Sequence, residues 1–442
     1  MLLVISVGVL TAGLLSAGTG DSAYNPSNEV ASSVDDAEEL TVVGVQETTK
    51  TNGSLRVYDE EGRLVYTNHT YSNYWDVDPV PGERYTVQYF ASGPGDCETA
   101  KKTKCIEAVI QLENISTGDT RRIYATNLVK HELSPLNVGT DHAVAWHDVD
   151  RLNGTHYVVG DMTENRVFVV NVTSGHITWE WQVKSDYPFS SGGVVPYDWA
   201  HLNDVEVVRD RQAIMVSLRN HDQVVFLNRK TGELMPELTV GEDDNHSVMY
   251  EQHNPDYIPV ERGGPAVIVA DSQNSRIVEY QRVDGRWKQS WIYETRGLSW
   301  PRDADRLPNG HTLITESTSN RVFEIDEEGD VVWSVDIAHP YEAERLGTGD
   351  ESAGGENAAS LGLPSERVTE EESAQASLST RIKGLFPTKL VNALKFVTPR
   401  WMGVIEFGAL VVALLSAVLL TGYEIVARWT LTISWPVSVS RR

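Results

Sequence analysis

A short strand motif recurs along this chain at intervals of about fifty residues, and it strongly limits the folds open to the chain. The typical copy carries a His, Asn or Arg and then acidic residues at alternating positions. The copies begin at Trp75, His147, His201, His253, Arg302 and Tyr341. Repeats of short strands are typical of β-propellers, in which the innermost strand of every blade lines one central channel. The sequence therefore predicts an all-β, six-bladed propeller whose axial residues converge.

Two hairpins near the ends of the repeat region predict how the ring closes. LRVYDEEGRLVY at 55–66 resembles VFEIDEEGDVVW at 322–333, and each has two apolar runs around a polar turn that contains Gly. The later hairpin follows an inner strand at 302–307, whereas no inner strand precedes the earlier one. The last inner strand, at 341–346, has no hairpin after it. Pairing this strand with the N-terminal strands completes the sixth blade and leaves no open sheet edge.

Composition divides the chain into five expected parts. They are a signal peptide or N-terminal membrane anchor, the propeller, a linker with a juxtamembrane segment, a transmembrane helix and a tail, at 1–20, 41–350, 351–400, 401–426 and 427–442. The apolar run at 2–18 is short for a span and lacks a basic start, so both N-terminal alternatives stay open. The run at 403–422 is long enough to cross a bilayer. Residues 381–400 fit a basic amphipathic helix on a membrane surface or a solvated helical spacer.

The charge of the chain argues against a nucleic-acid partner. The 442 residues carry a net charge of −26, which repels phosphate backbones. The acidic residues are scattered, which indicates a solvated acidic surface of the halophilic kind rather than a site for a cationic partner. No glycine-rich phosphate loop appears, so a nucleotide sulfate donor such as PAPS is not expected.

Cysteines and glycosylation sequons bear on the compartment. Cys97 and Cys105 lie close together and suggest a disulfide, with two buried free thiols as the alternative. Asn-x-Ser/Thr sequons occur at Asn52, Asn68, Asn114, Asn153, Asn171 and Asn245, so the chain is expected to be a glycoprotein. The cysteines and sequons favour a propeller outside the cytoplasm. More basic residues precede the C-terminal span than follow it, which by the positive-inside rule favours a propeller on the cytoplasmic side instead. Long domains translocate largely regardless of charge, so we expect the propeller on the extracellular side of the cell membrane.

Three histidines at blade spacing are the main candidates for chemistry. His201 and Asn203 are two residues apart, so strand alternation points both toward the channel. His147 lies one repeat earlier and His253, preceded by Gln252, one repeat later. A single strand histidine is often structural, but three at corresponding places in successive repeats predict a shared pocket.

These segments resemble the arylsulfate sulfotransferase family, periplasmic six-bladed propellers that move a sulfuryl group between phenols. Its Trp-x-His-x-Asn motif is similar to residues 199–203, and its Ser-Arg-His element to residues 217–221, with one residue inserted before Arg219. Its Gln-His pair is similar to residues 252–253, and a further active-site histidine matches His147. The resemblance covers about 41–350, and the acidic composition and C-terminal span look like haloarchaeal, membrane-anchored members.

The resemblance implies an enzyme that transfers a sulfuryl group from a phenolic sulfate ester to a phenol or other hydroxyl. His253 is then the nucleophile that forms a sulfohistidine, with no cofactor. A neutral imidazole can attack sulfur without a separate base, and Arg219 can hold two ester oxygens with its planar fork. His147, His201 and Asn203 would donate hydrogen bonds to the transferring oxygens. Arg302 either lines the pocket or pairs with Asp303.

Other interpretations of the same residues remain open. Three histidines could bind zinc or copper, but no HxxxH pair occurs and Arg219 would repel a cation, so no metal is predicted. The acidic residues of the inner strands, such as Asp148 and Asp303, are expected to brace neighbouring strands. The expected partners are a small aryl sulfate donor and a hydroxyl acceptor. The alternative functions are a non-catalytic, membrane-tethered propeller for binding or adhesion, and a sulfate-ester hydrolase.

Overall fold

A computed structural model describes residues 6, 9–11, 34–48, 51–95, 105–129, 146–195, 198–295, 297–349, 354–368, 388–398, 402, 404–432 and 438–441. The chain divides into two compact units. One comprises residues 28–370, and the other residues 1–27 together with 371–442.

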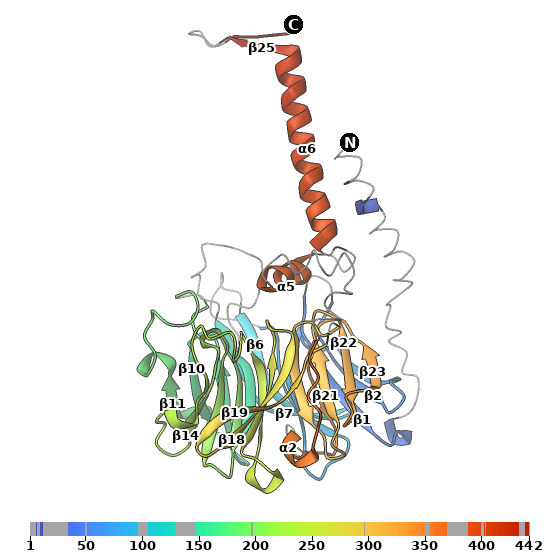
Figure 1. Ribbon diagram of the computed structural model, residues 1–442. Helices are drawn as coiled ribbons and strands as arrows, with labels where there is room; N and C mark the ends of the chain where they lie inside the picture. Colours follow the sequence, from blue (N-terminus) through green and yellow to red (C-terminus); the bar gives the residue numbers. More distant parts are fainter. Residues whose placement is uncertain are drawn as a thin grey trace. The chain divides into compact units, whose positions relative to one another are not determined.

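Residues 28–370 form a six-bladed β-propeller of four-stranded antiparallel sheets, as the sequence predicts (Figure 1). Blade 1 contains β4 (Asn73–Pro79), β5 (Thr86–Pro94), β6 (Cys105–Asn114) and β7 (Asp119–Val129). Blade 2 contains β8 (Trp146–Arg151), β9 (His156–Asp161), β10 (Arg166–Asn171) and β11 (His176–Gln182). Blade 3 contains β12 (Leu202–Val208), β13 (Ala213–Leu218), β14 (Gln223–Asn228) and β15 (Val240–Gly241).

The remaining blades complete the ring. Blade 4 contains β16 (His253–Ile258), β17 (Ala266–Asp271), β18 (Arg276–Val283) and β19 (Arg286–Tyr293). Blade 5 contains β20 (Pro301–Arg306), β21 (Thr312–Glu316), β22 (Arg321–Ile325) and β23 (Val331–Asp336). The closing blade contains β24 (Pro340–Arg345), β1 (Leu40–Val45), β2 (Ser54–Asp59) and β3 (Leu64–Asn68). Short 3₁₀ helices lie at Val34–Asp36, Val183–Ser185, Arg219–His221, Pro236–Leu238 and Val260–Arg262.

The closing blade joins the two ends of the propeller, which confirms the predicted closure. Its strand order is β24-β1-β2-β3, and β1 pairs with β24 in antiparallel register, with Val43 opposite Ala343. The innermost strand therefore comes from the end of the domain and the three outer strands from its beginning. This pairing removes the free edges that an open array would present.

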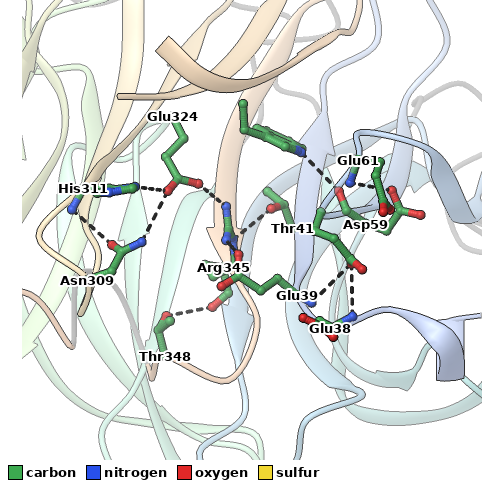
Figure 2. A network of polar contacts seen from close by, with 12 residues as sticks. Glu38, Glu39, Thr41, Asp59, Glu61, Asn309, His311, Glu324, Arg345 and Thr348 are labelled. Atoms are coloured by element: carbon green, nitrogen blue, oxygen red, sulfur yellow. Dashed lines mark hydrogen bonds and ion pairs between the residues drawn. The ribbon is translucent and has the colours of Figure 1, made fainter. Parts of the chain in front are cut away.

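Arg345 connects the closing blade to blade 5 through a network of polar contacts (Figure 2). Its Nε donates to Thr41 Oγ1 at 3.1 Å on β1, and its Nη atoms contact the carboxylates of Glu39 and Glu324. Glu324 lies on β22 and also contacts His311, whose Nδ1 is 2.5 Å from Glu324 Oε1. Arg345 and Glu324 are both buried, so the pair lies where water competes weakly.

Alternating side chains of each strand pack against two different blades. On β10, Val167 and Val169 join a cluster with residues of blade 3, whereas Phe168 and Val170 pack with Trp146 and residues of blade 1. Alternation with a period of two therefore makes each sheet apolar on both faces. Each fully buried Val contributes roughly 1.5 kcal/mol or more to folding.

Carboxylates of the inner strands brace neighbouring blades, as the sequence predicts. Asp148 Oδ2 accepts a hydrogen bond from the backbone N–H of Val205 at 2.5 Å, and Asp303 Oδ2 accepts one from Ala343 at 3.0 Å. In each case a side chain on one inner strand meets the backbone of the next blade's inner strand. Asp150 with Val207, and Glu206 with Tyr257, repeat the arrangement.

The start of the inner strands departs from simple alternation. His201, Trp300 and His339 each precede an inner strand and have left-handed backbone conformations, with φ of 48°, 50° and 49°. The register then shifts within the first residues of the strand, between Leu202 and Asp204 in β12. Bulges of this kind turn side chains in new directions. Simple alternation therefore does not determine the directions of His201 and Asn203, because His201 precedes the strand and a bulge follows.

Residues 354–368 pack on the propeller and differ in this respect from the expected flexible linker. Helix α2 (Ala358–Leu361) begins where the backbone N–H of Ala358 donates to the buried carboxylate of Glu279. Further along, Glu366 forms a parallel bridge with Tyr293 at the edge of blade 4. The composition of the segment is typical of a linker, and the contacts that order it come from blades far away in sequence.

The second unit contains the candidate membrane span. Helices α5 (Thr388–Val397) and α6 (Val404–Arg428) are followed by a hairpin of β25 (Trp429–Thr432) and β26 (Ser438–Arg441). Within α6, Ile405–Val426 is an apolar stretch of 22 residues with a mean hydropathy of 2.2, and its most apolar part is not buried against other residues of the chain. It has the length and composition of the predicted transmembrane helix. Most of the predicted N-terminal segment at 1–20 lies outside the described residues.

The predicted disulfide also involves an undescribed residue. Cys105 is buried at the start of β6, whereas Cys97 lies outside the described part of the chain. The pairing stays a prediction.

Candidate active site

The starts of the six inner strands bring the predicted residues to one end of the channel. His147 lies on β8, His253 begins β16, Arg302 lies on β20, and His201 directly precedes β12. Trp75 on β4 and Tyr341 on β24 occupy the corresponding places in blade 1 and the closing blade. Residues separated by up to 266 positions in the sequence therefore meet because all inner strands start at the same end of the ring.

His147 lies at the centre of an aromatic group. Its ring centroid is 5.4 Å from that of His201 and 4.6 Å from that of Trp75. Its Nδ1 is 3.1 Å from the hydroxyl oxygen of Tyr341. Burial raises the pKa of Tyr341, so this hydroxyl keeps its proton.

Both ring nitrogens of His201 are hydrogen-bonded, one to a carboxylate and the other to a guanidinium. Its Nδ1 is 2.5 Å from Asp198 Oδ1, and its Nε2 is 3.0 Å from Arg219 Nη1. A guanidinium only donates, so His201 Nε2 accepts and the ring proton lies on Nδ1, facing the carboxylate. Burial and the charge of Arg219 lower the pKa of His201 to about 4, and the ring is neutral at pH 7.

Arg219 is occupied by the same cluster. Besides His201, it donates through Nη2 to Asp198 Oδ2 at 3.3 Å and through Nε to Asn220 Oδ1 at 3.0 Å. Three of its donors are thus engaged within the chain. Two of its five N–H groups remain for the two ester oxygens that Arg219 is expected to hold, which stays a prediction.

His253 is buried, with 1 % of its surface exposed, and its orientation is fixed by Ser272. Its Nδ1 is 2.7 Å from Ser272 Oγ, and this hydroxyl in turn lies 2.7 Å from the carbonyl oxygen of Pro301. Because the hydroxyl donates its proton to the carbonyl, Ser272 Oγ accepts from Nδ1–H. The lone pair of His253 is then on Nε2.

The electrostatic surroundings keep His253 uncharged. Burial is the main cause that holds its pKa well below the ordinary 6.5, followed by the positive charges of Arg302 and Arg219 and the rings of His201 and His147. These effects also show that the predicted site residues act on one another at close range. The outcome is a neutral imidazole surrounded by cationic groups.

Arg302 is a buried cation that lines this site. It is 7 % exposed, and its guanidinium carbon lies 4.7 Å from the ring centre of Tyr341 and 5.3 Å from that of Trp300. Its Nε has no hydrogen-bond partner among the described residues, and the groups that shift its pKa include no carboxylate. Asp303 instead accepts from the backbone of Ala343. Arg302 forms no ion pair with Asp303 among the described residues and hydrogen-bonds to Tyr341, and its place in a pocket stays a prediction.

Asn203 contacts the segment that carries His253. Its Nδ2 donates to the backbone carbonyl of Gln252 at 2.8 Å, and its buried Oδ1 has no hydrogen-bond partner in the described residues. Gln252 is anchored in turn by Ser217 and by the carbonyl of Gln223. The amide of Asn203 therefore positions the start of β16.

Sequence reasoning missed Tyr341 and Ser272 as members of the site. Tyr341 stands directly before the first acid of its repeat, as do Trp75, His147, Asn203 and Arg302 in theirs. Aligning the repeats at this acid would have found Tyr341. Ser272 follows the second strand of blade 4, and no pattern in the sequence distinguishes it from other serines.

The charges at this end of the channel favour an anion over a cation. An uncompensated guanidinium in a buried place favours a negatively charged ligand. A metal ion bound by the three imidazoles fits less well, because both ring nitrogens of His201 are engaged and two guanidinium groups lie nearby. A separate cavity of about 260 Å³ lies at the opposite ends of the inner strands, near Asp78 and Arg151, and includes none of these residues.

No protein-family model and no curated protein matches the sequence. Solved structures that resemble the fold include a protein of unknown function from Bacteroides caccae, 12% identical, with a TM-score of 0.46 over 70% of this chain and 98% of that one. The periplasmic gluconolactonase of Pseudomonas aeruginosa is 13% identical, with a TM-score of 0.44 over 70% of this chain and 99% of that one. Virginiamycin B lyase from Staphylococcus aureus is 9% identical, with a TM-score of 0.37 over 70% of this chain and 87% of that one.

Proposed function

We propose that this chain is an arylsulfotransferase-like enzyme that moves a sulfuryl group from a phenolic sulfate ester to a phenol or other hydroxyl. The proposal is carried by two groups in the same site. One is the buried Arg302, whose charge no carboxylate among the described residues offsets, and the other is a neutral His253 of defined tautomer. A sulfate ester is a monoanion with its charge spread over oxygens. It matches both groups, because the guanidinium binds the oxygens while the imidazole attacks sulfur.

In the first step, the Nε2 lone pair of His253 forms a bond to sulfur and the bond between sulfur and the aryl oxygen breaks. The leaving phenolate keeps the electron pair and takes a proton from a neighbouring donor. His147 is placed for this role: as an imidazolium it gives its Nε2 proton to the departing aryl oxygen, keeps the Nδ1 proton facing the hydroxyl oxygen of Tyr341, and is left as a neutral imidazole. The enzyme then carries a sulfohistidine.

In the second step, an acceptor hydroxyl attacks the same sulfur. Its proton passes to the base left on His147, and the bond from sulfur to His253 breaks and returns the electron pair to Nε2. Arg302 faces the sulfuryl oxygens in both steps, where charge shifts toward them. Arg219 and His201 act as one hydrogen-bonded unit beside these groups.

On this proposal the propeller acts at a membrane surface, on its extracellular side. The candidate span in α6 provides the anchor. The paired-cysteine expectation and the sequons support an extracytoplasmic location. Outside a cell a donor that is itself an aryl sulfate replaces the nucleotide donor that the chain has no loop to bind.

The test is an assay with 4-nitrophenyl sulfate, with and without added phenol, on the full chain and on His253→Asn. Phenol-dependent release of nitrophenol that is lost in the variant, with a sulfuryl adduct on the peptide containing His253, supports the proposal. The control is His176→Gln, at an exposed histidine on β11, which should keep parental activity and creates no new sequon. Phenol-independent release indicates a hydrolase. Absence of turnover with a folded chain across aryl sulfate donors indicates a non-catalytic propeller.

A further inference from the structure

A second group of charged residues lies deeper in the channel and takes no part in the proposed reaction. Acidic residues follow the site residues along the inner strands, and most of them are buried: Asp76, Asp78, Asp148, Asp150, Asp204, Asp256, Asp303, Asp305, Glu342 and Glu344. They come from all six blades and repel one another across the axis, as Glu342 does with Asp76, Asp303 and Asp148. Asp148, Asp150 and Asp303 among them also accept hydrogen bonds from the backbone of a neighbouring blade.

Three of these carboxylates form a compact cluster. Asp256 on β16 and Asp303 and Asp305 on β20 each offer an oxygen, and the three oxygens lie within 4.8 Å of one another. The three residues are at most 3 % exposed. Oxygens that surround a calcium ion at about 2.3–2.6 Å are separated by distances of this size. The spacing is therefore that of ligands around one ion.

Two further observations indicate that a positive charge, from a proton or a cation, belongs at this carboxylate cluster. Asp305, which is 1 % exposed, receives no hydrogen bond from a permanent N–H or O–H donor among the described residues, and its carboxylate instead contacts the carboxyl groups of Asp256 and Glu344. Asp204, from blade 3, is 4 % exposed and has an Oδ1 without a donor among the described residues; it is repelled first by Asp148 and Glu206, and then by Asp256 and Asp303. Buried carboxylate oxygens without donors are costly unless a proton or a cation compensates them.

We propose that Asp256, Asp303 and Asp305, with Asp204 facing them, bind a divalent cation of the calcium type on the channel axis. All the ligands are hard oxygen atoms, and the cluster contains no His or Cys, which argues against zinc or copper. This site is distinct from an imidazole-bound metal, and it stands whether or not the sulfuryl transfer takes place. Its role is to offset carboxylate repulsion, and so to hold blades 3, 4 and 5 together.

The alternative is that the cluster holds protons in place of an ion. Burial and mutual repulsion raise the pKa of Asp303 and Asp305 well above the ordinary value, so shared protons could also relieve the repulsion. The two cases differ in their response to calcium and to the isosteric change Asp305→Asn. An amide substitutes for a protonated carboxyl but is a poor ligand for a cation.

The experiment measures thermal unfolding of the full detergent-solubilised chain with EDTA or with added calcium. It is performed in about 1 M KCl, where a screening length of about 3 Å suppresses weak binding to exposed acids. We expect calcium at about 100 times its Kd to raise the Tm by several degrees. Elemental analysis of the dialysed chain should find one calcium per chain. Asp305→Asn and Asp204→Asn should lose or weaken both effects.

Two controls make the result decisive. Asp284→Asn, in an exposed turn, should behave as the parent. Asp244→Asn tests the other acidic cluster, formed by Asp222, Asp244 and His246. Loss of the ion in Asp244→Asn but not in Asp305→Asn would overturn the proposal, because the ion would then belong to that cluster. So would a parent chain that shows neither bound ion nor a response to calcium, with Asp305→Asn equally or more stable.

Discussion

The Nδ1 atom of His253 lies 2.7 Å from the hydroxyl oxygen of Ser272, which itself lies 2.7 Å from the carbonyl oxygen of Pro301. This chain of two hydrogen bonds links the first residue of β16 to the end of β17 and to the first residue of β20. It determines which nitrogen of a buried imidazole carries the proton. A reactive tautomer is thus set by contacts within blade 4 and with the blade next to it.

Replacing Ser272 with Ala should slow formation of the sulfohistidine. Without an acceptor at Nδ1, the ring loses the preference for the tautomer with a lone pair on Nε2, and we expect kcat to fall roughly 10- to 100-fold with a smaller change in KM. Rapid-quench measurement of the sulfuryl adduct on His253 checks this. Ser174→Ala, in an exposed turn, is the matched control. An unchanged rate of adduct formation would show that Ser272 has only a structural role.

The acid limb of the activity profile should lie below pH 6.5. Burial and the neighbouring positive charges hold the pKa of His253 below its ordinary value, so the nucleophile stays neutral as the pH falls through 6.5. In Arg302→Gln one of these charges is absent, and we expect the acid limb to move to higher pH.

Arg302→Gln also tests the binding of the substrate. Loss of a charge-assisted contact to the ester oxygens should lower kcat/KM roughly 100-fold. The measurement is kcat/KM for 4-nitrophenyl sulfate between pH 5 and pH 8, and Arg286→Gln, at an exposed position on β19, is the control. An acid limb at the same pH in parent and variant would contradict the role given to Arg302.

His201 should make the folded chain less stable in acid. Its pKa of about 4 in the folded state lies below the ordinary 6.5, so the unfolded chain binds more protons between these values. The free energy of unfolding therefore falls as the pH drops, by roughly 2 kcal/mol between pH 7 and pH 5 from this group. Urea unfolding of the parent and of His201→Gln at both pH values measures the difference. Equal pH dependence of the two chains would argue against a neutral His201 in the folded chain.

Arg345 should be essential for closure of the ring. In Arg345→Met the buried carboxylate of Glu324 loses a cationic partner, and we expect the free energy of unfolding to fall by roughly 3–5 kcal/mol. The double variant with Glu324→Leu should recover part of this loss, because no buried charge then remains uncompensated. Arg151→Met, at an exposed position, is the control. The urea midpoint is the readout, and a double variant no more stable than the single one would contradict the explanation.

The repeat alone was sufficient to predict the propeller and its closure. Inner strands with alternating acids recur at blade spacing, and the unpaired hairpin at 55–66 matches the unpaired strand at 341–346. These are local patterns of period two and of a fixed repeat length, which sequence displays directly. The same repeat placed His147, His253 and Arg302 at one end of the channel.

The chemical state of the site depends on contacts that the sequence does not display. Arg219 and His201 bind each other and Asp198, Tyr341 contacts His147, and Ser272 sets the tautomer of His253. The contact between Tyr341 and His147 joins two blades, and the others lie within blade 3 or within blade 4. The left-handed residue and the bulge at the start of β12 also redirect the side chains that simple alternation would place. Sequence determined which residues reach the axis, because strand and repeat periods are local. Tertiary structure decided their partners and protonation, because burial and electrostatic interaction depend on distances across the ring.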